Sequence, residues 1–441
     1  MRLLVAGATA PLQGELIIPP SKYHAHRALM LAALAEGEST IADRTDARHV
    51  AFTVQALRGL GVEISTSGRQ WKVSGAGGFS PRQDEVSVGS SGTTLYFLLG
   101  LAALGDRPVT IIGQRYFRRR PIGPLLRALQ RLGVHLEYEG QTLPVKVHPG
   151  RPRGGHVRID GTLSQWISGL LMLAPFATEE ETRIEVVGEL NERPYIELTV
   201  EMMRDFGLEV EVGEDWRHFT VAPNQRAKAR EGYLLPPDIG SAAFGLAACA
   251  LHPSKVVFRS SVPIHGHPEA SVLTELQGVG VPMQFAADGL SITMDHDGTP
   301  PVAGKLDCRD IPDMVPILST LASRARGRTV LSHVSHVRLK ESDRVTSMLQ
   351  LRKMGARVEF DGNDMEFEGV DRLHGAELSS FNDHRVLMAL AVAGSTASGV
   401  TELSYPHAYR ISYPEFADHM NAIGIPIAVS AHVPTTPGEL T

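Results

Sequence analysis

Four cationic side chains stand beside the starts of apolar segments, where a helix would begin with free backbone N–H groups. They are Lys22, Arg120, Arg344 and Arg385. Because a guanidinium group presents a rigid fork that matches a carboxylate or a phosphate, this set suits a small anion that carries both groups. Two carboxylates, Asp313 and Glu341, lie in segments of the same kind and could move protons on a ligand held there.

The segments that position these residues belong to a pattern that occurs six times. Each copy begins with a polar residue suited to cap a helix and continues as a run rich in Ala, Leu and Gly. The predicted caps are Ser21, Ser91, Ser164, Asp238, Asp313 and Asn382. Because the runs are apolar on most faces, we expect each to form a buried helix that leads into a strand.

A second pattern alternates with the first and ends each time at a glycine. An amphipathic helix stops at a residue that can adopt the left-handed conformation, and an alternating strand follows. The glycines are Gly61, Gly133, Gly207, Gly280, Gly355 and Gly424, with spacings of 72, 74, 73, 75 and 69 residues. Six units of the type strand, helix, strand, helix, strand, strand are therefore predicted, three in each of two domains.

The polar ends of the buried helices indicate where a ligand would bind. If three such helices converge in each domain with their N-termini at one end, the partial positive charges of their dipoles add there. Two such ends facing one another would form a cleft suited to anions, so that a protein of net negative charge could bind a phosphate ester.

Composition narrows the function classes. The 441 residues include 43 Lys and Arg against 49 Asp and Glu, and the balance of 43 − 49 = −6 argues against nucleic acid or an anionic membrane as the main partner. No stretch approaches the apolar length of a membrane span, so the cytoplasm is the expected compartment. Cys249 and Cys308 are far apart and predict core thiols, with no disulfide. The pairs His24/His26 and His265/His267 are expected to be structural, with no metal bound.

Seven segments together resemble the 5-enolpyruvylshikimate-3-phosphate synthase family of enolpyruvyl transferases. They are PPSKYHAHRALMLAALAEG, VGSSGTTLYFLLG, RRRPIGPLLRALQRLG, SQWISGLLM, IPDM, VRLKESDR and FNDHR. Cell-wall enolpyruvyl transferases match less well, because the loop from Gln114 to Arg120 holds no Cys where that family usually has one. Singly, these residues could be plain caps, turns or surface charges, but all six units place a polar group at the equivalent position.

The resemblance implies an α/β protein of two domains, each with three βαβαββ units in pseudo-threefold symmetry around buried helices. It implies a discontinuous domain of residues 1–18 and 236–427 and a second domain of residues 19–235, while the Pro- and Thr-rich residues 428–441 are expected to be a loose tail. The implied reaction transfers the enolpyruvyl group of phosphoenolpyruvate to an acceptor hydroxyl and releases phosphate, without metal or cofactor. A monomer that closes on its ligands is expected.

The resemblance also assigns roles to individual residues. Donor binding is implied for Lys22, Gly92, Arg120, Gln165, Arg344 and Arg385. Glu341 would protonate the donor methylene carbon, Asp313 would take the acceptor hydroxyl proton, and Lys22 would assist the leaving phosphate. Acceptor contacts are implied for Tyr23, Arg27, Leu163, Ser164, Gln165, Glu192, Asp313, His336 and Lys340. The implied supporting residues are Tyr96, His384 and Asp46, the last of which would steady Lys22.

Departures from the family pattern fall mainly where the family binds its acceptor, shikimate 3-phosphate. Tyr23 stands where the family has a small Ser, Leu163 and Glu192 replace serines that hold the 3-phosphate, and His336 replaces an Asn. A carboxylate beside a phosphate in a poorly hydrated cleft is repulsive by roughly a few kcal/mol. On the donor side, an Asn, an Arg and a Lys are replaced by Ser90, Tyr96 and Ile411.

Three functional hypotheses stay open. The leading one is an enolpyruvyl transferase with another acceptor, such as a nucleoside monophosphate or a shikimate-like ring without the 3-phosphate, against which Tyr23 and Tyr96 could stack. The second is an ordinary 3-phosphoshikimate 1-carboxyvinyltransferase that tolerates these substitutions. The third is a non-catalytic relative that kept an anion site.

Overall fold

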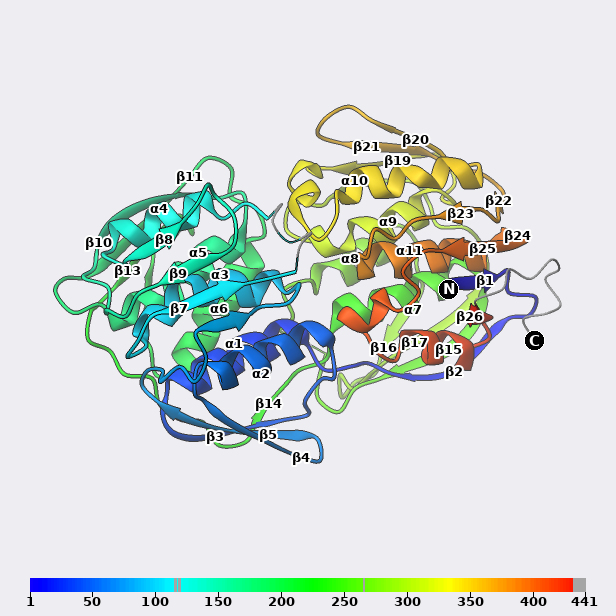
Figure 1. The fold of residues 1–441 in the computed structure, drawn as a ribbon. Coiled ribbons are helices and arrows are strands. Elements are labelled where there is room, and N and C mark those ends of the chain that lie inside the picture. The colour runs from blue at the N-terminus through cyan, green and yellow to red at the C-terminus, as the bar shows by residue number, and fades with distance from the viewer. Residues whose placement is uncertain (115–116, 118–119, 265, 431–441) are drawn as a thin grey trace. The chain divides into compact units, whose positions relative to one another are not determined.

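The computed structural model describes residues 1–114, 117, 120–264 and 266–430, and the chain divides into two compact units (Figure 1). The continuous unit is Pro20–Leu235, and the discontinuous unit combines Met1–Pro19 with the chain from Pro236 onward. The divisions that the sequence predicts, after residues 18 and 235, lie within one residue of these.

Six four-stranded sheets repeat one topology, three in each unit. In every sheet the first strand is parallel to the second, and the remaining neighbours are antiparallel. In the continuous unit the sheets are β14 (Tyr233–Leu234), β3 (Glu36–Ala42), β5 (Gln70–Ala76), β4 (Glu63–Ser67); β6 (Glu85–Ser87), β7 (Val109–Ile112), β9 (Val145–Val147), β8 (Leu136–Tyr138); and β10 (Gly155–Asp160), β11 (Thr182–Val187), β13 (His218–Val221), β12 (Glu211–Val212).

The discontinuous unit uses both ends of the chain to complete its sheets. They are β2 (Leu12–Ile17), β15 (Pro253–Arg259), β17 (Ser291–Asp297), β16 (Met283–Phe285); β18 (Lys305–Asp307), β19 (Arg328–Ser332), β21 (Met365–Glu368), β20 (Arg357–Phe360); and β23 (Glu377–Leu378), β25 (Val400–Leu403), β1 (Arg2–Ala6), β26 (Ile427–Ser430). A separate pair joins β22 (Leu373–His374) to β24 (Ala397–Ser398).

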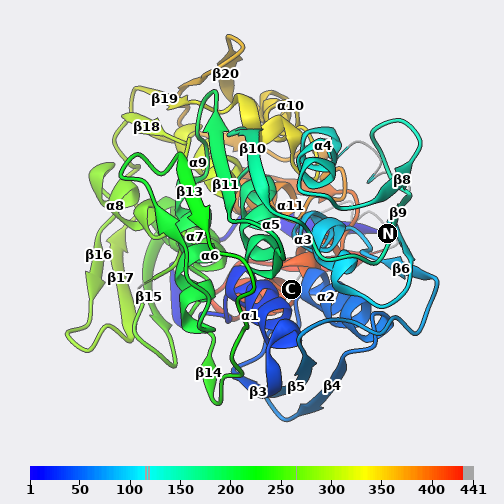
Figure 2. The ribbon, with the colours of Figure 1, turned by 90° about the vertical axis from the view of Figure 1, so that its left-hand side faces the viewer.

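One apolar helix of each repeat forms the interior of its unit. These inner helices are α1 (Lys22–Leu34), α3 (Gly92–Leu101), α5 (Ser164–Leu173), α7 (Ile239–Leu251), α9 (Val315–Ala322) and α11 (His384–Ser395). Every residue of α1, α7, α9 and α11 is buried, as the lack of a polar face predicts. Figure 2 shows the three sheets of the continuous unit around α1, α3 and α5.

The second helix of each repeat is amphipathic and buries one face. These outer helices are α2 (Arg48–Gly59), α4 (Gly123–Arg131), α6 (Arg193–Asp205), α8 (Ser271–Gly278), α10 (Arg344–Met348) and α12 (Phe416–Ala422). The glycines predicted to stop them all have positive φ, between 76° at Gly207 and 103° at Gly424. This confirms the left-handed ends, since only glycine adopts that conformation at little cost.

Three of the predicted helix caps are wrong. Ser164 is the first residue of α5, whose N-cap is Leu163. Asp313 lies inside a short 3₁₀ helix, Pro312–Met314, which precedes α9. Asp383, rather than Asn382, caps α11 by accepting a hydrogen bond from the Arg385 N–H at 2.9 Å. In each case the polar side chain near the helix start has another partner or a neighbour with better geometry.

The chain end differs from the prediction. Residues 428–430, predicted to begin a loose tail, belong to β26, which pairs with β1 from Arg2↔Ser430 to Val5↔Ile427. The rest of that tail, and His265, lie outside the described residues. Cys249 and Cys308 are buried and not bonded to each other, and burial raises the pKa of the Cys249 thiol to about 12.

Candidate active site

Three predicted donor-binding residues lie together in the continuous unit. Gly92 is the first residue of α3, and Gln165 is the second of α5. A methyl group built on Gly92 would lie 3.4 Å from Cζ of Arg120 and 3.6 Å from Nε2 of Gln165. Gln165 Nε2 donates a 3.0 Å hydrogen bond to Thr93 Oγ1, and its buried Oε1 has no hydrogen-bond partner among the described residues. A guanidinium and an amide beside two helix N-termini suit an anion.

The segment that carries Arg120 is fixed by α5. Trp166, which follows Gln165, donates a 3.1 Å hydrogen bond from Nε1 to the Pro121 carbonyl. The guanidinium of Arg120 lies 5.7 Å from the centroid of the Phe117 ring, and Arg120 is only 5% exposed. The helix that presents Gln165 therefore also places Arg120.

Lys22 begins α1 and is buried. Its Nζ lies 4.8 Å from the centroid of the Tyr23 ring, and Tyr23 packs edge-on against Tyr195 at 5.1 Å. The predicted partner of Lys22, Asp46, instead forms an ion pair with Arg44, and the Asp46 side chain is 64% exposed. Arg44 stands only two residues away and reaches that carboxylate, while the supporting role of Asp46 stays a prediction.

A chain of buried hydroxyl groups joins α1, α2 and α3. His26 Nδ1 lies 2.7 Å from Thr53 Oγ1, which lies 2.6 Å from Thr94 Oγ1, and Thr94 donates a 2.7 Å hydrogen bond to Ser91 Oγ. Burial lowers the pKa of His26 well below its ordinary value, and nearby His49 and two cations lower it further. A neutral imidazole thus helps to hold the N-cap of α3 next to Gly92.

Arg27, predicted to contact the acceptor, points into the continuous unit instead. Its Nε donates to Thr199 Oγ1 at 2.8 Å, Nη2 to the Tyr195 carbonyl at 3.1 Å and Nη1 to the Tyr23 carbonyl at 3.2 Å. Burial lowers the pKa of Arg27 to about 10. These acceptors on α6 hold the side chain and tie α1 to α6, while the acceptor contact of Arg27 stays a prediction.

Two of the substituted family positions are core residues. Tyr96 is fully buried within the continuous unit, and Ile411 is 2% exposed in the discontinuous unit. The Tyr96 ring is not exposed in this structure, and its stacking role stays a prediction.

Glu192 places a carboxylate at the start of α5. Its Oε2 accepts hydrogen bonds from the Ser164 backbone N–H at 3.2 Å and from Ser164 Oγ at 2.6 Å. Glu192 is 1% exposed, and its φ of 60° is left-handed, which costs a residue other than glycine about 1–2 kcal/mol. Backbone strain of this kind persists only where the surroundings enforce it. The positive end of α5 is thus neutralised by a side chain of the protein itself.

In the discontinuous unit, Arg344 lies among three carboxylates. It is fully buried, and it donates from Nη1 to Asp313 Oδ1 at 2.5 Å, from Nη2 to Glu341 Oε2 at 2.9 Å and from Nε to Asp383 Oδ2 at 3.0 Å. Burial alone would lower the pKa of Arg344, but Asp383, Asp313 and Glu341 together raise it well above its ordinary value. A permanently charged guanidinium thus holds both predicted proton-transfer residues in fixed positions.

Asp313 also contacts the second buried guanidinium of this unit, that of Arg385. Asp313 Oδ2 lies 3.4 Å from Arg385 Nη2, and Arg385 Nη1 donates to the Gly240 carbonyl at 2.6 Å. Glu269 Oε2 lies 4.0 Å from the same Nη2. Two positive groups on opposite oxygens stabilise the Asp313 carboxylate, and a fixed carboxylate can accept a proton from a hydroxyl.

The remaining predicted residues of this unit lie on neighbouring segments. His336 is buried in the 3₁₀ helix Ser335–Leu339, and Lys340 follows it half-buried. His384 is fully buried, with Nδ1 3.9 Å from Asp383 Oδ1.

Sequence reasoning missed four residues that organise the two clusters. They are Thr93, Gly240, Glu269 and Asp383. The sequence did indicate the position of Asp383, because this residue directly follows the helix cap predicted at Asn382. It did not indicate Glu269, because a buried glutamate in a loop has no recognisable spacing.

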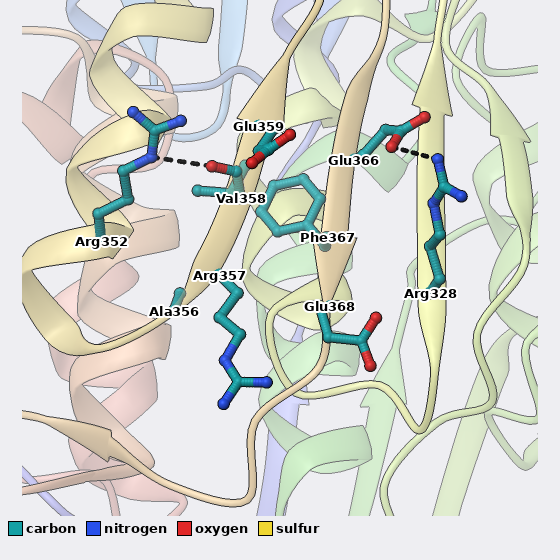
Figure 3. A pocket seen from close by; sticks show the side chains of 9 residues that line it. All are labelled: Arg328, Arg352, Ala356, Arg357, Val358, Glu359, Glu366, Phe367 and Glu368. Atoms are coloured by element: carbon teal, nitrogen blue, oxygen red, sulfur yellow. Dashed lines mark hydrogen bonds and ion pairs between the residues drawn. The ribbon is translucent and has the colours of Figure 1, made fainter.

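A hollow outside both clusters is less suited to an anion. Its volume is about 540 Å³. Arginine and glutamate side chains mix along its lining, over β19, β20 and β21 (Figure 3). Arg328 is paired with Glu366, and Arg352 Nε donates to the Val358 carbonyl at 2.8 Å. The opposite charges offset each other, so we do not place the site there.

Comparison with known proteins decides the family. The family model described as EPSP synthase (3-phosphoshikimate 1-carboxyvinyltransferase) matches residues 7–420. The chain belongs to the EPSP synthase family. Relatives named 3-phosphoshikimate 1-carboxyvinyltransferase include one from Methanococcus maripaludis strain C6, 33% identical over 97% of this chain and 100% of its own, and one from Methanocella arvoryzae, 35% identical over 94% and 97%. As a member of the EPSP synthase family, the protein is an enolpyruvyl (carboxyvinyl) transferase.

A solved structure confirms the EPSP synthase fold. EPSP synthase from Acinetobacter baumannii aligns with a TM-score of 0.80 at 24% identity, covering 98% of this chain and 100% of the other. The two-domain α/β architecture inferred from the repeats is thereby confirmed. Among the helices of the described residues, none has the length and apolar character needed to cross a lipid bilayer.

Replacing Gly92 by alanine should weaken binding of phosphoenolpyruvate without unfolding the protein. The new methyl group would meet its nearest protein atoms at 3.4 to 3.6 Å, an ordinary contact distance, so only a ligand would be crowded. Because one methylene in a fitted pocket changes binding by about 10- to 200-fold, we expect the KM for the donor to rise at least tenfold in steady-state kinetics.

The matched control is Gly278→Ala, at the end of α8, where a methyl group meets no atom within 4 Å. Both variants should keep the wild-type melting temperature or exceed it slightly, since alanine favours a helix over glycine by about 1 kcal/mol. An unchanged donor KM in Gly92→Ala would mean that Gly92 does not contact the donor.

Proposed function

We propose that this enzyme transfers the enolpyruvyl group of phosphoenolpyruvate to a hydroxyl of an acceptor other than shikimate 3-phosphate. The acceptor carries no phosphate at the start of α5. A shikimate-like ring without the 3-phosphate fits this description, and so does a nucleoside monophosphate whose phosphate is bound elsewhere.

The Glu192 carboxylate is the observation that supports this proposal. It accepts hydrogen bonds from both the N–H and the hydroxyl of Ser164, which are the donors that an anionic ligand at this helix end would use. A phosphate there would have to displace a buried carboxylate or lie beside it, and both alternatives are costly in a site with little water. Leu163, fully buried at the N-cap, offers no side-chain hydrogen bond in compensation.

The proposed reaction is addition followed by elimination. Asp313 takes the proton of the acceptor hydroxyl, and the oxygen of that hydroxyl bonds to the central carbon of the donor. Glu341 delivers a proton to the methylene carbon of the donor, which becomes a methyl group. In the second step the bond between the central carbon and the bridging phosphate oxygen breaks. Lys22 assists the leaving phosphate, and Glu341 takes back a proton from the methyl group. Donor binding is assigned to Gly92, Arg120, Gln165, Arg344 and Arg385, with Lys22 contributing to both tasks. Arg344 can take this role only by releasing part of its present ion-pair set.

The names of the relatives favour a second candidate, the ordinary 3-phosphoshikimate 1-carboxyvinyltransferase. A phosphate-release assay with phosphoenolpyruvate separates the two, with shikimate 3-phosphate, shikimate and nucleoside monophosphates as acceptors. We expect the wild-type protein to release little phosphate with shikimate 3-phosphate, and Glu192→Ser to raise kcat/KM for that acceptor by about 10- to 100-fold, because a repulsive charge is removed.

The control is Glu192→Gln, which removes the negative charge of the side chain and keeps its size. Comparing this variant with Glu192→Ser therefore distinguishes charge repulsion from steric exclusion. Wild-type turnover of shikimate 3-phosphate at about 10 s⁻¹, the median for enzymes, would overturn the altered-acceptor proposal. A calorimetric titration in which phosphoenolpyruvate fails to bind, alone or with any acceptor of the panel, would instead favour a non-catalytic relative.

A further inference from the structure

Strands β8 and β9 present two histidines and a glutamate on one outer face of the continuous unit. Leu136↔Val147 and Glu137↔Lys146 are paired across these antiparallel strands, and the next pair is closed by a 3.0 Å hydrogen bond from His148 N to the His135 carbonyl. Because alternate side chains of a strand share a face, His135 and Glu137 point the same way, and His148 lies directly across from His135. The apolar Leu136 and Val147 are buried on the opposite face.

The three side chains already contact one another. The rings of His135 and His148 are stacked, with centroids 4.1 Å apart and planes 18° apart. His148 Nε2 lies 2.6 Å from Glu137 Oε1, and one ligand atom from each of the three residues lies within 4.8 Å of the others.

We propose that His135, Glu137 and His148 form a surface site for a divalent transition-metal ion of the zinc type. Two imidazole nitrogens and one carboxylate oxygen are a ligand set that Zn²⁺ accepts, with water in the fourth position. Bond lengths of about 2.0–2.2 Å require the ligand atoms to approach slightly, and the exposed His135 and Glu137 side chains can rotate to allow it. Hard cations such as Mg²⁺ prefer oxygen ligands and would bind poorly.

The site is independent of the enolpyruvyl chemistry. Figure 2 shows β8 and β9 at the edge of the continuous unit, whereas α1 and α5 lie in its middle. The nearest competitor for the carboxylate is Lys146, whose Nζ lies 3.4 Å from Glu137 Oε2 and occupies the oxygen that His148 does not use. The bound ion would join residues 13 positions apart in sequence (148 − 135 = 13) and would therefore stabilise the β8–β9 hairpin.

Calorimetric titration of the full-length protein with zinc chloride, in a buffer that does not chelate metals, tests the proposal. We expect one equivalent to bind with a dissociation constant in the micromolar range. His135→Ala and His148→Ala should each weaken that binding by at least about tenfold, since a three-ligand site loses one ligand. The matched control is His156→Ala, which removes an exposed histidine outside the proposed site, 3.4 Å from Glu185, and should leave zinc binding unchanged.

A readout that does not depend on stability comes from nuclear magnetic resonance of the imidazole nitrogens. Zinc should shift the signals that disappear in the His135 and His148 variants and should leave the His156 signal in place. The proposal is overturned if wild-type binding is no tighter than about 1 mM, or if both variants bind zinc as the wild type does. Circular dichroism of the variants should show an unchanged spectrum, as expected for substitutions at the surface.

Discussion

Replacing Arg344 by methionine is expected to destabilise the protein by about 3–5 kcal/mol, the cost of leaving buried charges without their partner. Its guanidinium forms ion pairs with Asp313, Glu341 and Asp383, and Arg344 and Asp383 are fully buried. Methionine fills a similar volume but supplies no hydrogen bond. Urea unfolding followed by circular dichroism measures the change.

The matched control is Arg328→Met. Arg328 forms an ion pair with Glu366 on the exposed face of β19, and such pairs contribute about 0–1 kcal/mol. Arg344→Lys should fall between the two variants, because a single ammonium cannot satisfy three carboxylates from one position. If Arg344→Met lost less than about 1 kcal/mol, the three carboxylates would have to be protonated or hydrated in the folded protein.

The second large effect is expected on turnover. Replacing Asp313 by asparagine keeps the size of the side chain but removes the base and one partner of each guanidinium, so kcat should fall by about 10²–10⁴-fold. The donor KM should change by much less, as expected for a group that transfers a proton. The measurement is steady-state phosphate release with whichever acceptor gives the highest wild-type rate.

Asp343→Asn is the control for this variant. Asp343 caps α10 by accepting a hydrogen bond from the Thr346 N–H at 3.1 Å, and asparagine caps a helix equally well. Its turnover should stay near the wild-type value. A kcat for Asp313→Asn within tenfold of the wild type, with a much higher donor KM, would make Asp313 a positioning residue for Arg385 instead.

The fold was largely predictable because it repeats. Six glycines at nearly constant spacing must each end a helix in the left-handed conformation, and all six do so. Residues 428–430 were not predictable in this way, because the pairing of β26 with β1 is a contact between the two ends of the chain. No local pattern in a Pro- and Thr-rich segment reveals such a partner.

The sequence predicted which candidate residues lie near one another more readily than it predicted their contacts. Gly92, Arg120 and Gln165 do lie together, as do Asp313, Glu341, Arg344 and Arg385. Arg27 and Asp46 show why individual side-chain contacts are harder to predict. Each had a nearer partner, Thr199 or Arg44, that only the three-dimensional arrangement reveals.

The position of β1 and β2 in the sequence affects the order in which the two units can fold during synthesis. Both strands precede the continuous unit in the sequence, yet β2 pairs with β15 and β1 pairs with β25 and β26, which are synthesised more than two hundred residues later. The continuous unit has all of its strands once residue 235 has emerged, and domains generally fold as units during synthesis. Strands β1 and β2 must therefore wait for their partner strands while the continuous unit can already fold, and we infer that this interval is when a nascent chain most needs a chaperone.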